Sequence, residues 1–295
     1  MAEGDRQPVE DSIPETPREL LPPAGYGLNI VPPIAAVPAV TDFVPPSEGA
    51  WAPIKDFAVL LGVAVAIVLF DLLAVGVAHS LPKYRNVPLS TLTTDPQVLV
   101  GGQLASYPLA LLLMVALVRI RTGQPFAAAI HWNWPRRPAS FFFGAGIVLA
   151  FAIEVLSHFL PIPKSLPVDK FFDSESTAYL MAFFGIVVAP LMEELFFRGL
   201  LYPLVRRSLG VVGGVLLTAV LFAAIHGAQL GNAWAPVFSI FVVGVALTLV
   251  RERTGSVAAS FLTHSGYNSA LFTVLWFASD HFRHLEKLTA AGVYR

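Results

Sequence analysis

The sequence predicts an all-α protein, built as a polytopic membrane bundle of about seven helices. Of its 295 residues, 55% are hydrophobic and only 13% are charged, and the mean hydropathy is +0.67. A soluble domain usually has about a quarter of its residues charged. The apolar residues also form long continuous runs rather than an alternating pattern, which favours spanning helices over barrel strands.

The first 50 residues form a separate, proline-rich segment. They contain ten of the 24 prolines, including the pairs Pro22-Pro23, Pro32-Pro33 and Pro45-Pro46. Such a segment buries too little apolar surface to fold alone, so we expect residues 1–50 to be a disordered tail. This tail is either a spacer or a polyproline arm that binds a partner.

Seven apolar runs follow within residues 51–295, which we expect to form one transmembrane domain. Each run is close to the ~20 residues that a helix needs to cross the bilayer. The fifth run is short and the seventh carries polar groups, and the pattern leaves room for an eighth membrane-embedded segment. The runs are 56–79, 97–119, 139–160, 178–205, 211–228, 234–250 and 256–278.

Basic residues between the runs predict the orientation, because Lys and Arg gather in cytoplasmic loops. Most of them lie in the second, fourth and sixth loops. We therefore expect a cytoplasmic amino terminus and a carboxyl terminus on the far side of a cell membrane, the inner membrane of a bacterium. The residues counted are Arg119, Arg121, Arg136, Arg137, Arg206, Arg207, Arg251 and Arg253.

Composition also excludes several kinds of site and partner. The chain has no cysteine, so disulfides, thiolate metal sites and a cysteine nucleophile are excluded. The net charge of −1 gives no indication of a nucleic-acid partner.

The fourth run contains charged residues that a spanning helix normally avoids. Glu193, Glu194 and Arg198 lie inside it, and each costs at least ~2.5–3.5 kcal/mol on insertion scales, which suggests a function. Glu194 and Arg198 are four residues apart, so they share a helix face and can form an ion pair. Glu193 points about 100° away from that face. Pro190 stands just before the glutamates and is expected to kink or loosen the helix.

Two later runs carry polar partners at a similar depth. His226 ends the fifth run, and His264 shares a face with Asn268 in the seventh. We expect Glu193, His226, His264 and Asn268 to converge on one wet pocket, with Glu194 and Arg198 bracing it. The alternative is that these groups only hydrogen-bond between packed helices.

Three further intramembrane polar groups match no motif. Glu154 and His158 lie four residues apart in the third run, and Asp71 lies in the first. We interpret them as structural or cavity-lining groups.

A carboxylate, two imidazoles and an amide are suited to activating water against an amide bond. The same Glu193, His226 and His264 could instead ligate Zn²⁺, which would lower the pKa of a bound water. Ligating histidines usually donate their second nitrogen to a carboxylate or carbonyl, and Glu194 already has Arg198 at helical spacing. This favours a metal-free site, although the residues leave both mechanisms open. No His-Glu-x-x-His, Gly-x-Gly-Asp or Gly-x-Ser-x-Gly pattern occurs.

Three motifs in order carry a family resemblance. Glu193-Glu194-x-x-x-Arg198, Phe222-x-x-x-His226 and His264-x-x-x-Asn268 resemble those of the CAAX protease and bacteriocin-processing family, also called the type II CAAX prenyl endopeptidase or Abi family. The resemblance covers residues 178–278. It implies an intramembrane peptidase that acts on a peptide or membrane-protein substrate within the bilayer. It also implies that Glu193 is the base, His226 its partner, and His264 and Asn268 the oxyanion stabilisers. Members have been described both as metalloproteases and as metal-free glutamate proteases, so the resemblance does not decide on zinc.

Two other function classes remain open on the sequence. One is a non-catalytic membrane scaffold or bacteriocin-immunity protein, although every motif position is intact. The other is an ion- or proton-coupled transporter, since these also use intramembrane Glu and His. Transporters often show paired broken helices in an internal repeat, and no such repeat is evident. Peptide cleavage with and without a change at Glu193 distinguishes the three classes.

Overall fold

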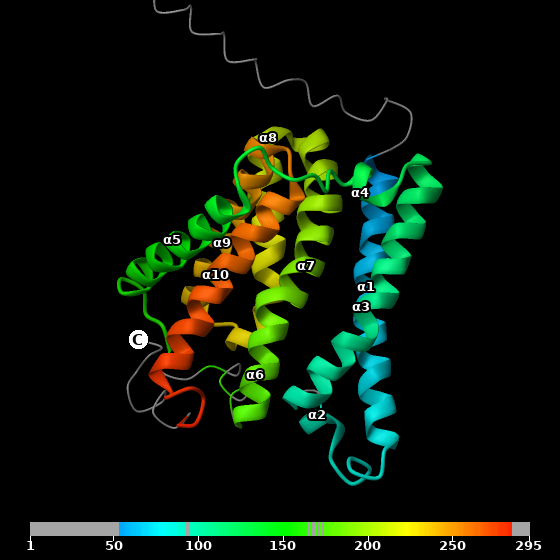
Figure 1. Ribbon diagram of the computed structural model, residues 1–295. Coiled ribbons are helices and arrows are strands. Elements are labelled where there is room, and N and C mark those ends of the chain that lie inside the picture. The colour runs from blue at the N-terminus through cyan, green and yellow to red at the C-terminus, as the bar shows by residue number, and fades with distance from the viewer. Residues whose placement is uncertain are drawn as a thin grey trace, which may run out of the picture. The chain divides into compact units, whose positions relative to one another are not determined.

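The computed structural model describes residues 53–92, 95–163, 166, 169, 172 and 174–284, which lie within one compact unit, Val44–Arg295. The predicted tail, residues 1–50, lies outside the described residues. Every regular element among the described residues is a helix, so the predicted all-α fold is confirmed (Figure 1).

Seven long helical stretches correspond to the seven predicted runs, joined by short helical turns. In chain order the elements are α1 (Pro53–Ser80), α2 (Leu89–Leu92), α3 (Pro96–Thr122), α4 (Phe126–Ala129), α5 (Ala139–Ser157), α6 (Glu175–Phe183), η2 (Phe184–Val188), α7 (Ala189–Glu194), η3 (Leu195–Leu201), α8 (Tyr202–Ile225), η4 (Ala228–Leu230), α9 (Trp234–Thr254) and α10 (Val257–Ala278). The elements η2 and η3 are π-helical, whereas η4 is a 3-10 turn.

Within the described residues, five stretches are long and apolar enough to cross a membrane: Phe57–Ser80, Pro96–Thr122, Ala139–Ser157, Glu175–Ile225 and Trp234–Thr254. The fourth is 51 residues long and contains two predicted runs. These runs are separated at Gly210, where φ of 69° and ψ of −176° break the helix. The polar residues of α10 lower its hydropathy, so α10 is not among the five. The chain is thus a multi-pass membrane protein, and seven spans remains a prediction.

A tight turn places α10 directly beside α9. Gly255 ends α9 in the left-handed region with φ of 64°, a conformation that glycine adopts without strain. Ser256 then caps α10 by accepting a hydrogen bond from the Ala259 N–H at 3.0 Å. The polar residues of α10 are therefore positioned against the same core that α9 contacts.

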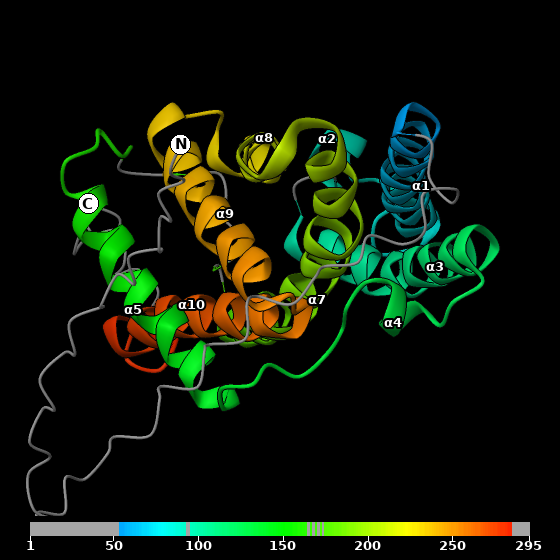
Figure 2. The same cartoon turned by 90° about the horizontal axis from the view of Figure 1, so that it is seen from above.

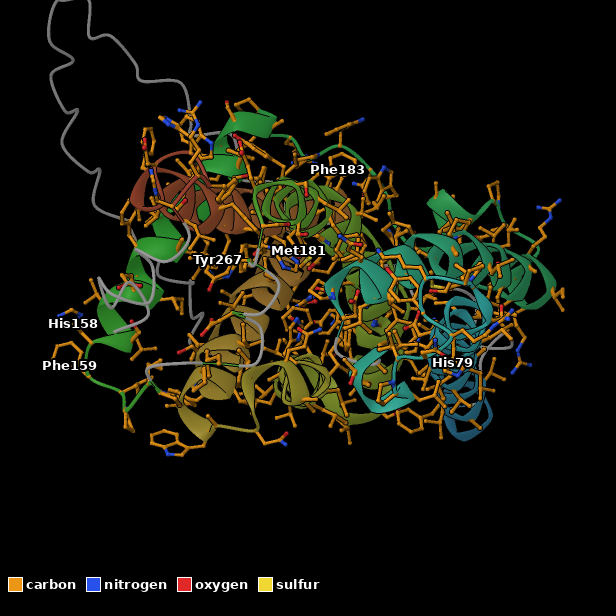
Figure 3. The ribbon with its side chains drawn as sticks, turned by 90° about the horizontal axis from the view of Figure 1, so that it is seen from below. His79, His158, Phe159, Met181, Phe183 and Tyr267 are labelled. Atoms are coloured by element: carbon orange, nitrogen blue, oxygen red, sulfur yellow. The ribbon has the colours of Figure 1, made fainter. Side chains whose placement is uncertain are left out.

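Two glycines let α5 and α10 approach closely (Figure 1). A Cβ atom at Gly146 would lie 2.0 Å from the Thr263 carbonyl oxygen, and one at Gly266 would lie 2.1 Å from the Phe143 carbonyl oxygen. Small residues at a crossing are the usual way in which membrane helices gain packing. Tyr267 packs beside this crossing against Ile153 and Leu247 (Figure 3).

Seen from above, α7 and α8 lie between the α1–α3 pair and the group α5, α9 and α10 (Figure 2). Met192, Phe197 and Leu201 belong to one buried apolar cluster with residues of α1 and α3. The segment from α7 to η3, which carries the motif glutamates, is thus packed on both sides.

Candidate functional site

The carboxylate of Glu193 faces two imidazoles from different helices. Its Oε1 lies 3.9 Å from Nε2 of His226, and its Oε2 lies 3.8 Å from Nε2 of His264. These separations exceed the length of a direct hydrogen bond, 2.7–3.2 Å, and polar contacts of this length are commonly bridged by water. The structure therefore brings together three of the four residues that the sequence assigned to one pocket.

The second nitrogen of each imidazole is held by an oxygen acceptor. Nδ1 of His226 lies 2.8 Å from the Phe222 carbonyl oxygen, and Nδ1 of His264 lies 2.9 Å from Oε1 of Glu194. Because a carbonyl or carboxylate oxygen can only accept, both Nδ1 atoms must be donors. In the neutral rings, Nε2 is then an acceptor that faces Glu193.

Glu194 and Arg198 form the ion pair that their spacing predicts. Nη1 of Arg198 donates to Oε1 of Glu194 at 2.8 Å, and both side chains are fully buried. Ser260 donates to the other carboxylate oxygen at 2.6 Å. A buried pair is tolerated only when its remaining polar atoms are also satisfied, and these bonds meet that need for Glu194.

The guanidinium of Arg198 is anchored on α9. It donates to the Gly244 carbonyl oxygen at 3.1 Å and to Oγ1 of Thr248 at 3.4 Å. Its central carbon also lies 4.4 Å from the centre of the Phe222 ring. A Cβ atom at Gly244 would lie 3.1 Å from Cα of Ala219, so the glycine allows α9 to come close to α8.

Sequence reasoning missed three members of this network: Ser260, Gly244 and Thr248. Ser260 had a readable signal, because it precedes His264 by four residues and so shares its helix face. Gly244 and Thr248 had none, because nothing in the spacing of α9 indicates that it faces Arg198.

Asn268 is bonded to the backbone of η2, ahead of the motif glutamates, rather than to the three-residue cluster. Its Nδ2 donates to the Gly185 carbonyl oxygen at 2.6 Å, which engages one of its two amide hydrogens. Gly185 lies in the π-helical segment η2, five residues before Pro190. The loosening expected at Pro190 is thus a π-helical turn.

The match to a known family covers this whole site. Residues 175–270 match the family model of the type II CAAX prenyl endopeptidases, Rce1-like. This region is Rce1-like. The resemblance carried by the three motifs is therefore confirmed, and at the level of the family it indicates a peptidase. No curated protein and no solved structure matches the chain.

The sequence argument against a metal at Glu193, His226 and His264 was that Glu194, already paired with Arg198, could not also orient a histidine. The geometry contradicts this argument. Glu194 accepts hydrogen bonds from both Arg198 and His264, so the ion pair does not deprive His264 of a carboxylate partner. The donor types of Glu193, His226 and His264 suit zinc. Across the described part of the chain, however, no group of three or more His, Cys, Asp or Glu side chains is arranged to hold a metal ion.

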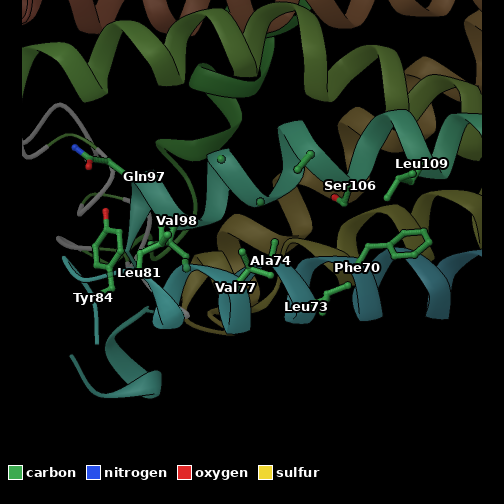
Figure 4. Close-up of a pocket in the computed structure, with 14 residues that line it drawn as sticks. Phe70, Leu73, Ala74, Val77, Leu81, Tyr84, Gln97, Val98, Ser106 and Leu109 are labelled. Atoms are coloured by element: carbon green, nitrogen blue, oxygen red, sulfur yellow. The ribbon is translucent and has the colours of Figure 1, made fainter. Parts of the chain in front are cut away.

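Glu154, His158 and Asp71, the polar residues that match no motif, are not among the partners of Glu193 described above. Glu154 and His158 are exposed near the end of α5 (Figure 3). Asp71 accepts a hydrogen bond from Ser106 at 2.6 Å between α1 and α3. Ser106 also lines an apolar cavity of about 410 Å³ between these two helices, which none of the motif residues lines (Figure 4).

Proposed function

We propose that this protein is an intramembrane endopeptidase in which Glu193 activates a water molecule that attacks a peptide carbonyl. The observation that carries the proposal is the position of the Glu193 carboxylate, 3.8–3.9 Å from two imidazole nitrogens. Its setting within an Rce1-like region supports the reaction class.

The orientation of the water follows from the hydrogen-bond pattern. Water between Glu193 and His226 donates one hydrogen to the carboxylate and the other to the free Nε2 of His226. Its oxygen lone pair then points away from both groups, toward the substrate. As the oxygen attacks the carbonyl carbon, the proton passes to Glu193.

Collapse of the tetrahedral intermediate needs a proton on the leaving nitrogen. Glu193 returns the proton it took, the C–N bond breaks, and a carboxylic acid and an amine form. The proton of the acid then passes to the amine, so the products leave as a carboxylate and an ammonium ion. The uptake and the return of the first proton use the same Glu193 carboxylate, so the chain needs no second general acid.

His264 stabilises the oxyanion only when both of its nitrogens carry a proton. Its Nδ1 already donates to Glu194, so donation from Nε2 requires the imidazolium form. Asn268 contributes the amide hydrogen that is not bonded to Gly185.

We propose a peptide or membrane-protein substrate that reaches Glu193 within the bilayer of the cell membrane. We propose that the amino terminus lies in the cytoplasm, which the basic residues of the loops favour. Two of those basic residues form contacts between helices. Arg251 is buried and donates to the Arg198 carbonyl oxygen at 3.3 Å, and Arg206 pairs with Glu252 at 2.9 Å. The orientation therefore rests on the remaining basic residues.

The test is cleavage by purified protein in phospholipid vesicles. The probe is a quenched fluorescent peptide with a farnesylated cysteine followed by three carboxyl-terminal residues, and its unprenylated form is the comparison. We expect the wild type to release the tripeptide and Glu193→Gln to lose at least a hundredfold in rate, a usual contribution of a general base. The variant should fold normally, because Glu193 makes no contact shorter than 3.8 Å to its imidazole partners. Cleavage by Glu193→Gln at the wild-type rate would remove Glu193 from the base role.

A further inference from the structure

Two consecutive backbone carbonyls before the motif glutamates accept hydrogen bonds from α10. Asn268 donates through Nδ2 to the Gly185 oxygen at 2.6 Å. Ser265 donates through Oγ to the Ile186 oxygen at 2.9 Å. Both carbonyls lie inside the π-helical segment η2, where a side-chain donor would normally compete with the helix's own N–H groups.

Pro190 explains why these two oxygens need outside donors. A residue at position 190 would donate its N–H to Ile186 in an α-helix and to Gly185 in a π-helix. Proline has no N–H to donate. The preceding residue, Ala189, donates to the Phe184 oxygen, which is the five-residue spacing of a π-turn. The two carbonyl oxygens to which a residue at position 190 could donate are therefore the two that accept hydrogen bonds from α10.

The packing of the two helices supports the same contact. A Cβ atom at Gly185 would lie 2.7 Å from Cε2 of Phe272, so the absence of a side chain there lets α10 approach the backbone. Phe272 lies four residues after Asn268 and shares its helix face. The α10 face that carries Asn268 and Phe272 thus rests on the carbonyls before Pro190.

We propose that Ser265 and Asn268 are positioning residues, which replace the hydrogen bond that Pro190 removes and thereby fix Glu193 relative to His264. Glu193 follows Pro190 by three residues, and His264 directly precedes Ser265. The hydrogen bonds from Ser265 and Asn268 connect the segment before Glu193 to the helix that carries His264. They therefore help to fix the 3.8 Å separation between the Glu193 and His264 side chains. The positioning role rests on the function proposed above, whereas the replacement of the missing N–H does not.

The experiment is a double-mutant cycle of Ser265→Ala and Pro190→Ala in the full chain. Ser265→Ala leaves the Ile186 carbonyl without a donor, so the amides of Leu191–Glu194 are expected to exchange hydrogen faster, by about fivefold for a bond of ordinary strength. Pro190→Ala supplies an N–H, so Ser265→Ala should have little effect in that background. Ser265→Thr keeps the hydroxyl and should behave as the wild type.

The matched control is Ser239→Ala in α9. Ser239 also donates to a helix carbonyl, that of Ala235 at 3.3 Å, and it is also largely buried. It does not lie beside Pro190, so its effect should be the same with proline or alanine at position 190. Equal effects of Ser265→Ala in the two backgrounds would overturn the proposal.

A second readout separates positioning from stability. With the farnesylated peptide, Ser265→Ala should lower kcat about fivefold at unchanged KM, and Pro190→Ala should restore it. If the wild type cleaves neither peptide, the proposed function fails, and the exchange cycle still decides whether α10 replaces the missing N–H. If the effect of Ser265→Ala on hydrogen exchange depends on Pro190 but its kcat is unchanged, the positioning role is overturned.

Discussion

Nδ1 of His264 donates a hydrogen bond to Oε1 of Glu194, and the same oxygen accepts a hydrogen bond from the guanidinium of Arg198. One buried carboxylate oxygen therefore accepts hydrogen bonds from both Arg198 and the imidazole of His264. Loss of the brace should consequently change the orientation of His264 as well as the stability of the bundle.

Removal of either member of the Glu194–Arg198 pair should destabilise the protein strongly. Arg198→Ala leaves a buried carboxylate without its cation, and breaking such a pair costs ~3–5 kcal/mol. The control is Arg206→Ala, because the Arg206–Glu252 pair is about a quarter exposed and such pairs contribute ~0–1 kcal/mol. Thermal unfolding in detergent compares the two variants. Equal losses of melting temperature would contradict a stabilising role of the Glu194–Arg198 pair.

The two histidines should differ in what they contribute. Among the described residues, His226 makes its direct hydrogen bond to Phe222 of its own helix, and it is 20% exposed, so His226→Gln should lower the cleavage rate with little loss of stability. His264 is 5% exposed and bonded to the buried Glu194, so His264→Gln should lower both the rate and the melting temperature. Melting curves recorded beside cleavage rates test this, and matching melting temperatures would count against the Glu194–His264 bond.

Cleavage should continue without a tightly held zinc ion. Each Nε2 faces a different oxygen of Glu193, an arrangement suited to one bridging water and one oxyanion donor. Elemental analysis of active protein, followed by cleavage after exhaustive chelation, measures this. Stoichiometric zinc, with activity lost on its removal and restored on its return, would make Glu193 a ligand and leave the peptidase assignment in place.

Reporter fusions test the orientation. Fusions after Pro46, Arg137 and Arg207 should report the cytoplasm, and a fusion after Lys170 should report the opposite side, because basic residues favour cytoplasmic loops. The reverse pattern would show that the loop charges do not set the orientation.

The helices were predictable because hydrophobic runs of about 20 residues have few other folded forms in a bilayer. The grouping of Glu193 with His226 and His264 was predictable from depth along three helices. The bonds that connect helices were not, because spacing within one helix does not give the rotation of its neighbour. The donors to Arg198 on α9 and the contact of Ser265 with Ile186 belong to this second class. The loop expected between the fourth and fifth runs reduces to a break at Gly210, since a single glycine supplies the required backbone angles.

The buried network also sets an order of assembly. Glu194 and Arg198 lie in the middle of the chain, but their partners on α9 and α10 are synthesised later. Until those helices insert, the buried pair lacks the hydrogen bonds to Gly244 and from Ser260 that satisfy its remaining polar atoms, a state of high free energy. His264 arrives with the same late helix that completes the network. Under the proposed mechanism, the site is incomplete during biosynthesis, and cleavage begins only when nearly all of the membrane domain is in place.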